Sequence, residues 1–220
     1  MRVVLSALLL LAGSGALLQE PVAAGTTPTC FGRAATVVAG PAEDVHGTAG
    51  DDVVVGGATV TGESGDDRIC GAQAAYGMAG RDRIRVPQGA DAYGGEQADL
   101  IVVDSRAGAP MTFVHGDAGA DTLLGGPGAD GLFAGTGGDL VRGRRGDDLL
   151  HLSRGRNTAY GGRGDDRLAG GIHDDRLSGG RGDDLLDGDG LGNDDDRGDG
   201  GAGHDSCHAV ERPVSCVVAG

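Results

Sequence analysis

The chain has 220 residues, of which 46 are Gly, and a formal net charge of −15 at pH 7. Trp is absent and there are only 3 Tyr and 3 Phe, which excludes a compact core built on large aromatic side chains. The sequence contains no Lys, so all 18 basic residues are Arg. A chain this acidic repels phosphate backbones, and nucleic acid is therefore not an expected partner.

The first 24 residues have the three parts of a secretory signal peptide. Arg2 supplies the basic start, residues 3–18 are apolar apart from small Ser and Gly, and small or modest residues at 22–24 precede a cleavage point before Gly25. The apolar run is shorter than the ~20 residues that a transmembrane helix needs. We expect a secreted, extracellular protein, free or held at the cell surface, with no membrane span after cleavage.

An exported chain with 4 Cys is expected to form disulfides. Four cysteines allow three connectivities. Cys30 and Cys70 lie near one end of the mature chain, and Cys207 and Cys216 lie near the other. Local pairing within each of these two groups would fasten both ends of an elongated body.

A nine-residue repeat runs without insertion from Gly116 to Asp187. The fourth residue of each unit is Gly except at His173, the sixth is Asp except at Asn157, and the eighth is apolar throughout. The sixth-position acids of this block are Asp121, Asp130, Asp139, Asp148, Asp166, Asp175 and Asp184.

Looser copies of the same unit flank this block. They cover residues 47–55, 62–70, 77–85, 94–102 and 200–208, and they place Asp52, Asp67, Asp82, Asp99 and Asp205 at the sixth position. The stretches between them, including 103–115 and 188–199, are out of register with the repeat.

The residue types of the unit predict a flattened spiral. Gly permits the positive φ of a tight turn, and the last three residues predict a short strand with one inward apolar side chain. Two units then make one coil, so residues 18 apart stack at the sheet spacing of about 4.8 Å. Stacked carboxylates at ~5 Å repel by about 3 kcal/mol per pair at an effective dielectric of 20. A hard cation held by carboxylates and backbone carbonyls relieves this repulsion, and all-oxygen ligation favours Ca²⁺.

The unit Gly161–Ala169, with the sequence GGRGDDRLA, matches the pattern G-G-x-G-x-D-x-apolar-x at every specified position. The chain therefore resembles the RTX, or haemolysin-type, calcium-binding nonapeptide-repeat proteins of bacteria. The resemblance implies an all-β fold, a parallel β-roll or right-handed β-solenoid, that binds several Ca²⁺ ions between successive turns on one edge. The metal ligands are then expected among the sixth-position acids named above and the fourth-position glycines Gly128, Gly146, Gly164 and Gly182.

The expected organisation is a signal peptide at 1–24, an N-terminal cap at 25–46, the repeats at 47–208 and a C-terminal cap at 209–220. Almost no chain lies outside the repeats to house an active site, so an enzyme is not expected. Two functions remain open: calcium binding that drives folding, and a Ca²⁺-dependent adhesion or partner-binding module that uses the sheet face. The Thr residues and the 3 Tyr and 3 Phe are scattered in the sequence and predict no ordered row, which favours the first. The Arg residues at the third and seventh positions are expected to form exposed ion pairs.

Alternate units place their turns on opposite edges of the spiral. One edge is expected to collect Asp130, Asp148, Asp166 and Asp184 without interruption, and to hold a row of about three bridging ions. The other is expected to collect Asp121, Asp139, Asn157 and Asp175, where Asn157 offers an oxygen but no charge. Because Ca²⁺ affinity depends on ligand charge, the first of these edges should bind better.

Overall fold

The computed structural model describes residues 27–104, 110–188 and 195–218. The expected signal peptide at 1–24 lies outside these ranges. Within them, every regular element is a β-strand, and no helix is present that could cross a membrane.

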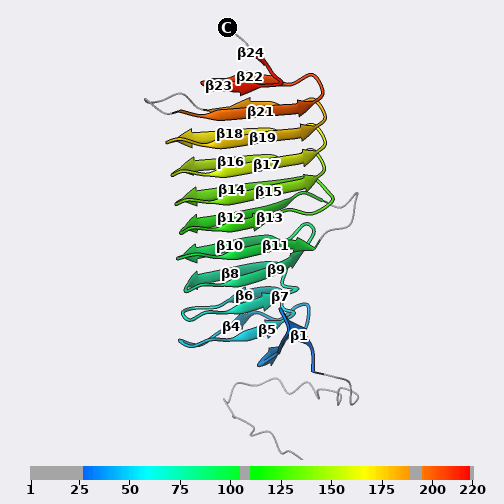
Figure 1. The fold of residues 1–220 in the computed structure, drawn as a ribbon. Coiled ribbons are helices and arrows are strands. Elements are labelled where there is room, and N and C mark those ends of the chain that lie inside the picture. The colour runs from blue at the N-terminus through cyan, green and yellow to red at the C-terminus, as the bar shows by residue number, and fades with distance from the viewer. Residues whose placement is uncertain (1–26, 105–109, 189–194, 219–220) are drawn as a thin grey trace, which may run out of the picture.

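The strands form a solenoid in which the chain alternates between two parallel sheets (Figure 1). The first sheet contains eleven strands, β4 (Val45–His46), β6 (Thr59–Thr61), β8 (Ala74–Ala79), β10 (Asp91–Glu96), β12 (Thr112–Ala118), β14 (Asp130–Thr136), β16 (Leu149–Arg154), β18 (Arg167–Ile172), β20 (Leu185–Asp187), β22 (Ser206–His208) and β24 (Val217–Val218).

The second sheet also contains eleven strands, β3 (Val37–Val38), β5 (Val53–Val55), β7 (Arg68–Cys70), β9 (Arg83–Pro87), β11 (Leu100–Asp104), β13 (Thr122–Leu124), β15 (Leu140–Arg145), β17 (Thr158–Arg163), β19 (Arg176–Arg181), β21 (Arg197–Ala202) and β23 (Arg212–Val214). A short antiparallel pair, β1 (Thr29–Cys30) and β2 (Arg33–Ala34), lies at the N-terminal end.

The register confirms the predicted spacing of two units per coil. Leu132 pairs with Leu150 and Leu150 with Leu168, each 18 residues further along. Coil length varies outside the central block: Ile69 pairs with Ile84 after 15 residues, and Leu186 pairs with Cys207 after 21. The solenoid therefore continues through the flanking segments that had looked out of register.

The core is a narrow column of eighth-position side chains. Leu132, Leu150, Leu168, Leu186 and Cys207 point inward from the first sheet, and they are all buried. The central strands are longer than the expected three residues. β16 to β19 each span six, because pairing with the neighbouring coils resumes at the second and third positions of the next unit, after a bend in which the second position has a positive φ. The first-position glycines thereby become part of the interior.

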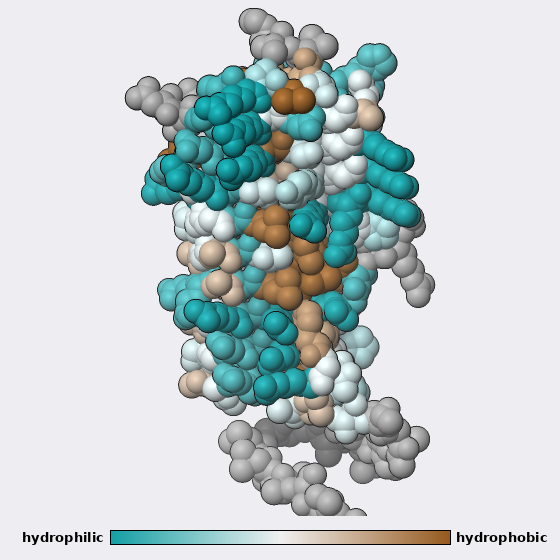
Figure 2. All heavy atoms as spheres, in the orientation of Figure 1, coloured by the Kyte–Doolittle hydropathy of each residue, from teal (hydrophilic) through white to brown (hydrophobic). Residues whose placement is uncertain are grey.

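Both expected disulfides are present. Cys30 bonds to Cys70 and Cys207 bonds to Cys216, with Cα atoms 5.7 Å apart in each case. Cys207 occupies an inward eighth position and is 1% exposed. The two bonds lie at opposite ends of the solenoid. The outer face seen in Figure 2 is hydrophilic toward both ends and carries hydrophobic side chains midway along the molecule.

Candidate metal centre

The sixth-position acids form two internal columns, one along each edge of the solenoid. The first Asp column precedes strands of the first sheet and contains Asp130, Asp148, Asp166, Asp184 and Asp205. The second Asp column precedes strands of the second sheet and contains Asp52, Asp67, Asp82, Asp99, Asp121, Asp139, Asn157, Asp175 and Asp196.

Each column is held together by one carboxylate oxygen per rung. The backbone N–H of Asp148 donates to Oδ1 of Asp166 at 2.8 Å, and the N–H of Asp166 donates to Oδ1 of Asp184 at 2.8 Å. The second column repeats this contact, for example from Asp121 N–H to Oδ1 of Asp139 at 2.9 Å. Each sixth-position side chain therefore fixes the spacing between its own coil and the neighbouring coil.

The other carboxylate oxygen is buried and accepts no hydrogen bond from any described residue. This is so for Oδ2 of Asp67, Asp82, Asp99, Asp121, Asp139, Asp148, Asp166, Asp175, Asp184 and Asp205. Buried polar groups in proteins are normally paired, so a row of such atoms indicates a ligand or a proton.

These oxygens lie against the first-position glycines. A Cβ atom added to Gly143 would lie 2.2 Å from Oδ2 of Asp148 and 2.8 Å from the carbonyl oxygen of Gly161. The same pair of contacts recurs at Gly77, with Oδ2 of Asp82 at 2.2 Å and the Gly94 carbonyl oxygen at 2.4 Å. A carboxylate oxygen and a carbonyl oxygen of the next coil thus converge at these two glycines, where an added Cβ would collide with both.

Burial strongly disfavours the charged form of these acids. Burial is the largest cause that raises the pKa of Asp148 to about 8, and the neighbouring charges of Asp166 and Asp130 contribute to the same rise. Desolvation likewise raises the pKa of Asp166 to about 7, with an added contribution from Asp184. At neutral pH the columns therefore need a proton or a cation to balance the buried carboxylates.

The first rung of each column differs from the rest. Oδ2 of Asp52 accepts hydrogen bonds from the N–H of Thr48 at 2.7 Å and from its hydroxyl at 3.0 Å. Oδ2 of Asp130 accepts from the N–H of Gly126 at 2.6 Å, and its Oδ1 accepts from Nε2 of Gln88 at 3.1 Å. The carboxylates of Asp52 and Asp130 are thereby satisfied within the chain and close the columns at their N-terminal ends.

The fourth-position glycines shape the turn around the acids. Gly146, Gly164 and Gly182 have φ of +107°, +126° and +127°, the left-handed region that favours Gly. A Cβ on Gly164 would lie 2.1 Å from the Gly146 carbonyl oxygen of the preceding coil. Gly128 is the exception, because its φ is not positive and its nearest neighbour is the side chain of Gln88.

A second, outer ladder runs beside the first column and was not anticipated from the sequence. It uses the fifth-position acids: the N–H of Asp165 donates to Oδ1 of Asp147, and the N–H of Asp183 donates to Oδ1 of Asp165, both at 2.9 Å. In this outer ladder each N–H donates to the preceding coil, whereas in the buried ladder each N–H donates to the following coil. The recurring Gly-Asp-Asp triplet is the sequence signal that identifies it.

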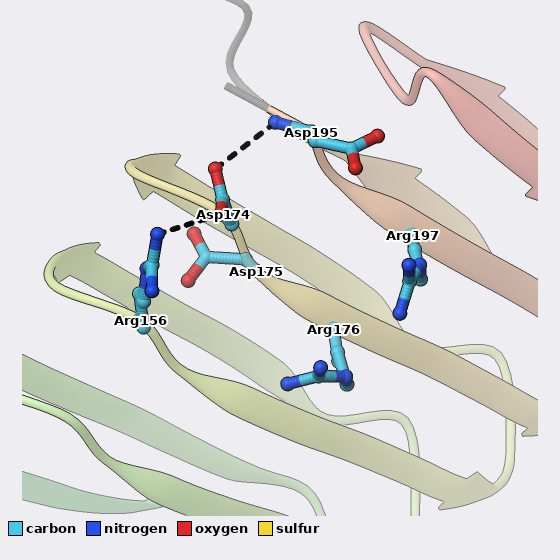
Figure 3. Close-up of a pocket in the computed structure, with 6 residues that line it drawn as sticks. All are labelled: Arg156, Asp174, Asp175, Arg176, Asp195 and Arg197. Atoms are coloured by element: carbon cyan, nitrogen blue, oxygen red, sulfur yellow. Dashed lines mark hydrogen bonds and ion pairs between the residues drawn. The ribbon is translucent and has the colours of Figure 1, made fainter.

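At the second edge the outer positions carry mixed charge. Asp174 accepts from the N–H of Asp195 at 3.2 Å and pairs with Arg156 of the preceding coil at 3.0 Å (Figure 3). Arg81 also occupies a fifth position on this edge and donates from its N–H to Asp66. The first edge, with its continuous Asp147, Asp165 and Asp183, is the more acidic of the two.

The second column continues beyond the residues expected from the repeat. Asp196 accepts from the N–H of Asp175 at 2.7 Å, and the N–H of Asp196 donates to Oε2 of Glu211 at 2.9 Å. The 21-residue separation of Asp175 and Asp196 hides this rung from a nine-residue pattern.

The donor set is suited to a hard cation bound largely by backbone oxygens. Among the described residues, no three or more His, Cys, Asp or Glu side chains gather in a metal-binding cluster. Within each column the carboxylates instead stand one per coil beside backbone carbonyls. Oxygen-only surroundings of this kind favour Ca²⁺ over Zn²⁺ or copper.

The fold and these columns define a parallel β-roll with internal rows of carboxylates. The family model of the RTX calcium-binding nonapeptide repeat matches residues 42–58, 113–141, 125–159, 142–175 and 151–186. The chain therefore carries repeats of the RTX calcium-binding family. A comparison with curated proteins finds no match.

Proposed function

We propose that this protein binds several Ca²⁺ ions along its edges in the extracellular space, and that the ions complete the folding of a non-catalytic β-roll. The observation that carries the proposal is the unbroken run of buried, unpaired Oδ2 atoms at Asp148, Asp166, Asp184 and Asp205. The RTX family match supports calcium as the ion. The two disulfides are compatible with an oxidising, extracellular location.

The structure suggests which rungs would hold the ions. Asp130 closes the first column through Gly126 and Gln88, so the row of ions would begin at Asp148. Asp166 and Asp184 would each face two neighbouring sites. Carbonyl oxygens of the first-position glycines, such as Gly161 and Gly143, lie beside the carboxylates and could complete the ligand sets. The bound ion would supply the positive charge that the buried columns lack.

Calcium titration of the mature protein tests this proposal. Circular dichroism should show most of the β-structure forming as Ca²⁺ is added, and native mass spectrometry should count the ions. Residual structure is expected near the disulfides without metal. Unchanged circular dichroism after confirmed removal of the metal would contradict the coupling of binding to folding.

Adhesion through the first sheet is the second candidate, and one observation favours it. Tyr76, Tyr93, His115 and Phe133 form a continuous stack on strands β8 to β14, with neighbouring ring centroids 4.7–4.9 Å apart. His151 on β16 extends the row with a tilted ring 6.3 Å from Phe133. The scattered aromatics of the sequence thus form an ordered row. Retention of the protein on cells should then require both Ca²⁺ and this row, which Tyr93→Ser with Phe133→Ser would interrupt.

A further inference from the structure

The two sheets differ sharply in charge. Strands of the second sheet carry two acids, Asp104 and Asp199, against eleven arginines, Arg68, Arg83, Arg85, Arg142, Arg144, Arg145, Arg163, Arg176, Arg181, Arg197 and Arg212. Strands of the first sheet carry two arginines, Arg154 and Arg167. In a chain of net charge −15, the positive charge is concentrated on one face.

Three of these arginines form a row near the C-terminal end. Arg176 pairs in register with Arg197, and Arg197 pairs with Arg212. Successive guanidinium groups therefore rise from adjacent strands, which are about 4.8 Å apart. All three side chains are exposed. The row forms one wall of a groove with a volume of about 510 Å³ on the outer surface of β17, β19, β21 and β23.

The repeat predicts that seventh-position arginines form exposed ion pairs, and for Arg176, the seventh residue of the unit 170–178, this is wrong. Arg212 pairs with Asp195 at 2.6 Å, whereas Arg176 and Arg197 form no ion pair with any other described residue. In Figure 3, the dashed lines connect Arg156, Asp174 and Asp195, and none reaches Arg176 or Arg197. Two neighbouring cations are thus available to a ligand.

The opposite wall of the groove offers an aromatic ring and a hydroxyl group. Tyr160 is 43% exposed, and the guanidinium carbon of Arg142 lies 5.3 Å from its ring centroid. Ser178 follows Tyr160 on the next strand, and Thr158 lies on the arginine side. Asp199 is the acid among the residues that line the groove.

We propose that this groove binds a linear acidic polysaccharide with one carboxylate per sugar, lying across the strands along the solenoid axis. Guanidinium groups bind carboxylates in a planar, two-bond geometry, and one Arg per coil matches a ligand with one carboxylate per pyranose ring. The hydroxyls of Thr158 and Ser178 suit sugar hydroxyls, and Tyr160 offers an apolar ring edge. The denser charge of a nucleic acid fits less well beside the acidic edges of this chain.

The test uses the calcium-loaded, disulfide-bonded protein and short oligogalacturonides, with binding measured by calorimetry. Arg176→Gln with Arg197→Gln should weaken binding by about tenfold or more, the loss expected from removing a charge-assisted hydrogen bond. Arg154→Gln with Arg167→Gln removes the same charge from the first sheet and should change affinity by less than about twofold. Circular dichroism of both variants in Ca²⁺ confirms the fold, so a failure of calcium-induced folding is seen separately.

Three results would overturn the proposal. The first is the absence of oligogalacturonide binding by folded, calcium-loaded protein. The second is an equal loss in the two double variants, which would mean attraction to overall charge without a site. The third is tighter binding of duplex DNA or inorganic polyphosphate than of the oligogalacturonide, which would assign the groove to another class of polymer.

Discussion

The side-chain amide of Asn157 donates a hydrogen bond from Nδ2 to the carbonyl oxygen of Gly155, 3.0 Å away. Its Oδ1 accepts from the N–H of Asp139 at 2.9 Å, as an Asp would at the same rung. Asn157 therefore preserves the ladder while its second atom is a donor with a partner inside the chain. At the neighbouring rungs, Asp139 and Asp175, the corresponding atom is Oδ2, an acceptor with no hydrogen-bond partner among the described residues.

This relationship predicts opposite effects for two isosteric substitutions. Asp166→Asn should raise the thermal stability of the calcium-free protein, because Nδ2 can reach the equivalent carbonyl of Gly164 and a buried charge is removed. The same variant should bind fewer Ca²⁺ ions. Asn157→Asp should lower calcium-free stability and strengthen binding at the second edge.

Melting temperatures in chelator and ion counts by native mass spectrometry measure both effects. Asp147→Asn is the control for a change of charge, since Asp147 belongs to the exposed outer ladder. Lower calcium-free stability of Asp166→Asn would contradict the proposed equivalence of the two rungs.

The two edges should respond unequally to loss of a carboxylate. Asp166 stands between Asp148 and Asp184, whereas Asp175 stands between Asn157 and Asp196. Asp166→Ala should therefore lower Ca²⁺ stoichiometry and apparent affinity more than Asp175→Ala, because ligand charge sets affinity. Calorimetry on both variants in one buffer makes the comparison. A larger loss from Asp175→Ala would show that the second edge is the stronger.

The central columns could be predicted from the sequence because eight units run without an insertion, which fixes the neighbours of Asp148 and Asp166 at 18 residues. The 18-residue spacing does not identify the neighbours where the coil length changes. Asp196 follows Asp175 by 21 residues, so the repeat did not reveal it. The arginine row was hidden for the same reason, because its steps are 21 and 15 residues.

The aromatic stack escaped prediction for a different physical reason. Phe133 and His151 occupy ninth positions, which the repeat leaves unspecified, whereas Tyr76, Tyr93 and His115 lie between units. Tyr76 and Tyr93 are joined through a 17-residue coil. The caps at Asp52 and Asp130 depend on Thr48, Gly126 and Gln88, and Gln88 lies 42 residues from Asp130. The Gln88 contact arises only when the coils are stacked, whereas Thr48 and Gly126 lie four residues before the carboxylates that they bind.

Gly161 should not tolerate even a methyl group. A Cβ on Gly161 would lie 2.3 Å from Oδ2 of Asp166, so Gly161→Ala must displace the carboxylate or the coil. We expect a loss of about 1–3 kcal/mol in the free energy of unfolding, as for other overpacked sites. Gly138→Ala is the matched control, because its nearest neighbour would lie 3.5 Å away. Urea denaturation in saturating Ca²⁺ measures both, and equal midpoints would contradict the close contact at Gly161.

Stability without calcium should fall as the pH rises. Burial raises the pKa of Asp148 and Asp99 from an ordinary value near 4 to about 8, so the folded chain binds more protons than the unfolded chain between these limits. The derivative of unfolding free energy with pH is then negative across this window. The stabilisation from protonation is complete below about pH 4 and is lost as the pH passes about 8.

Melting curves of thoroughly decalcified protein between pH 5 and pH 8 should show this decline. Calcium affinity should rise over the same range, because protons compete with the ion for the carboxylates. Asp148→Asn provides the control, since an amide does not titrate and its pH dependence should be shallower than that of the parent chain. A melting temperature of the metal-free parent that is constant or rises between pH 5 and pH 8 would show that the buried columns do not take up protons on folding.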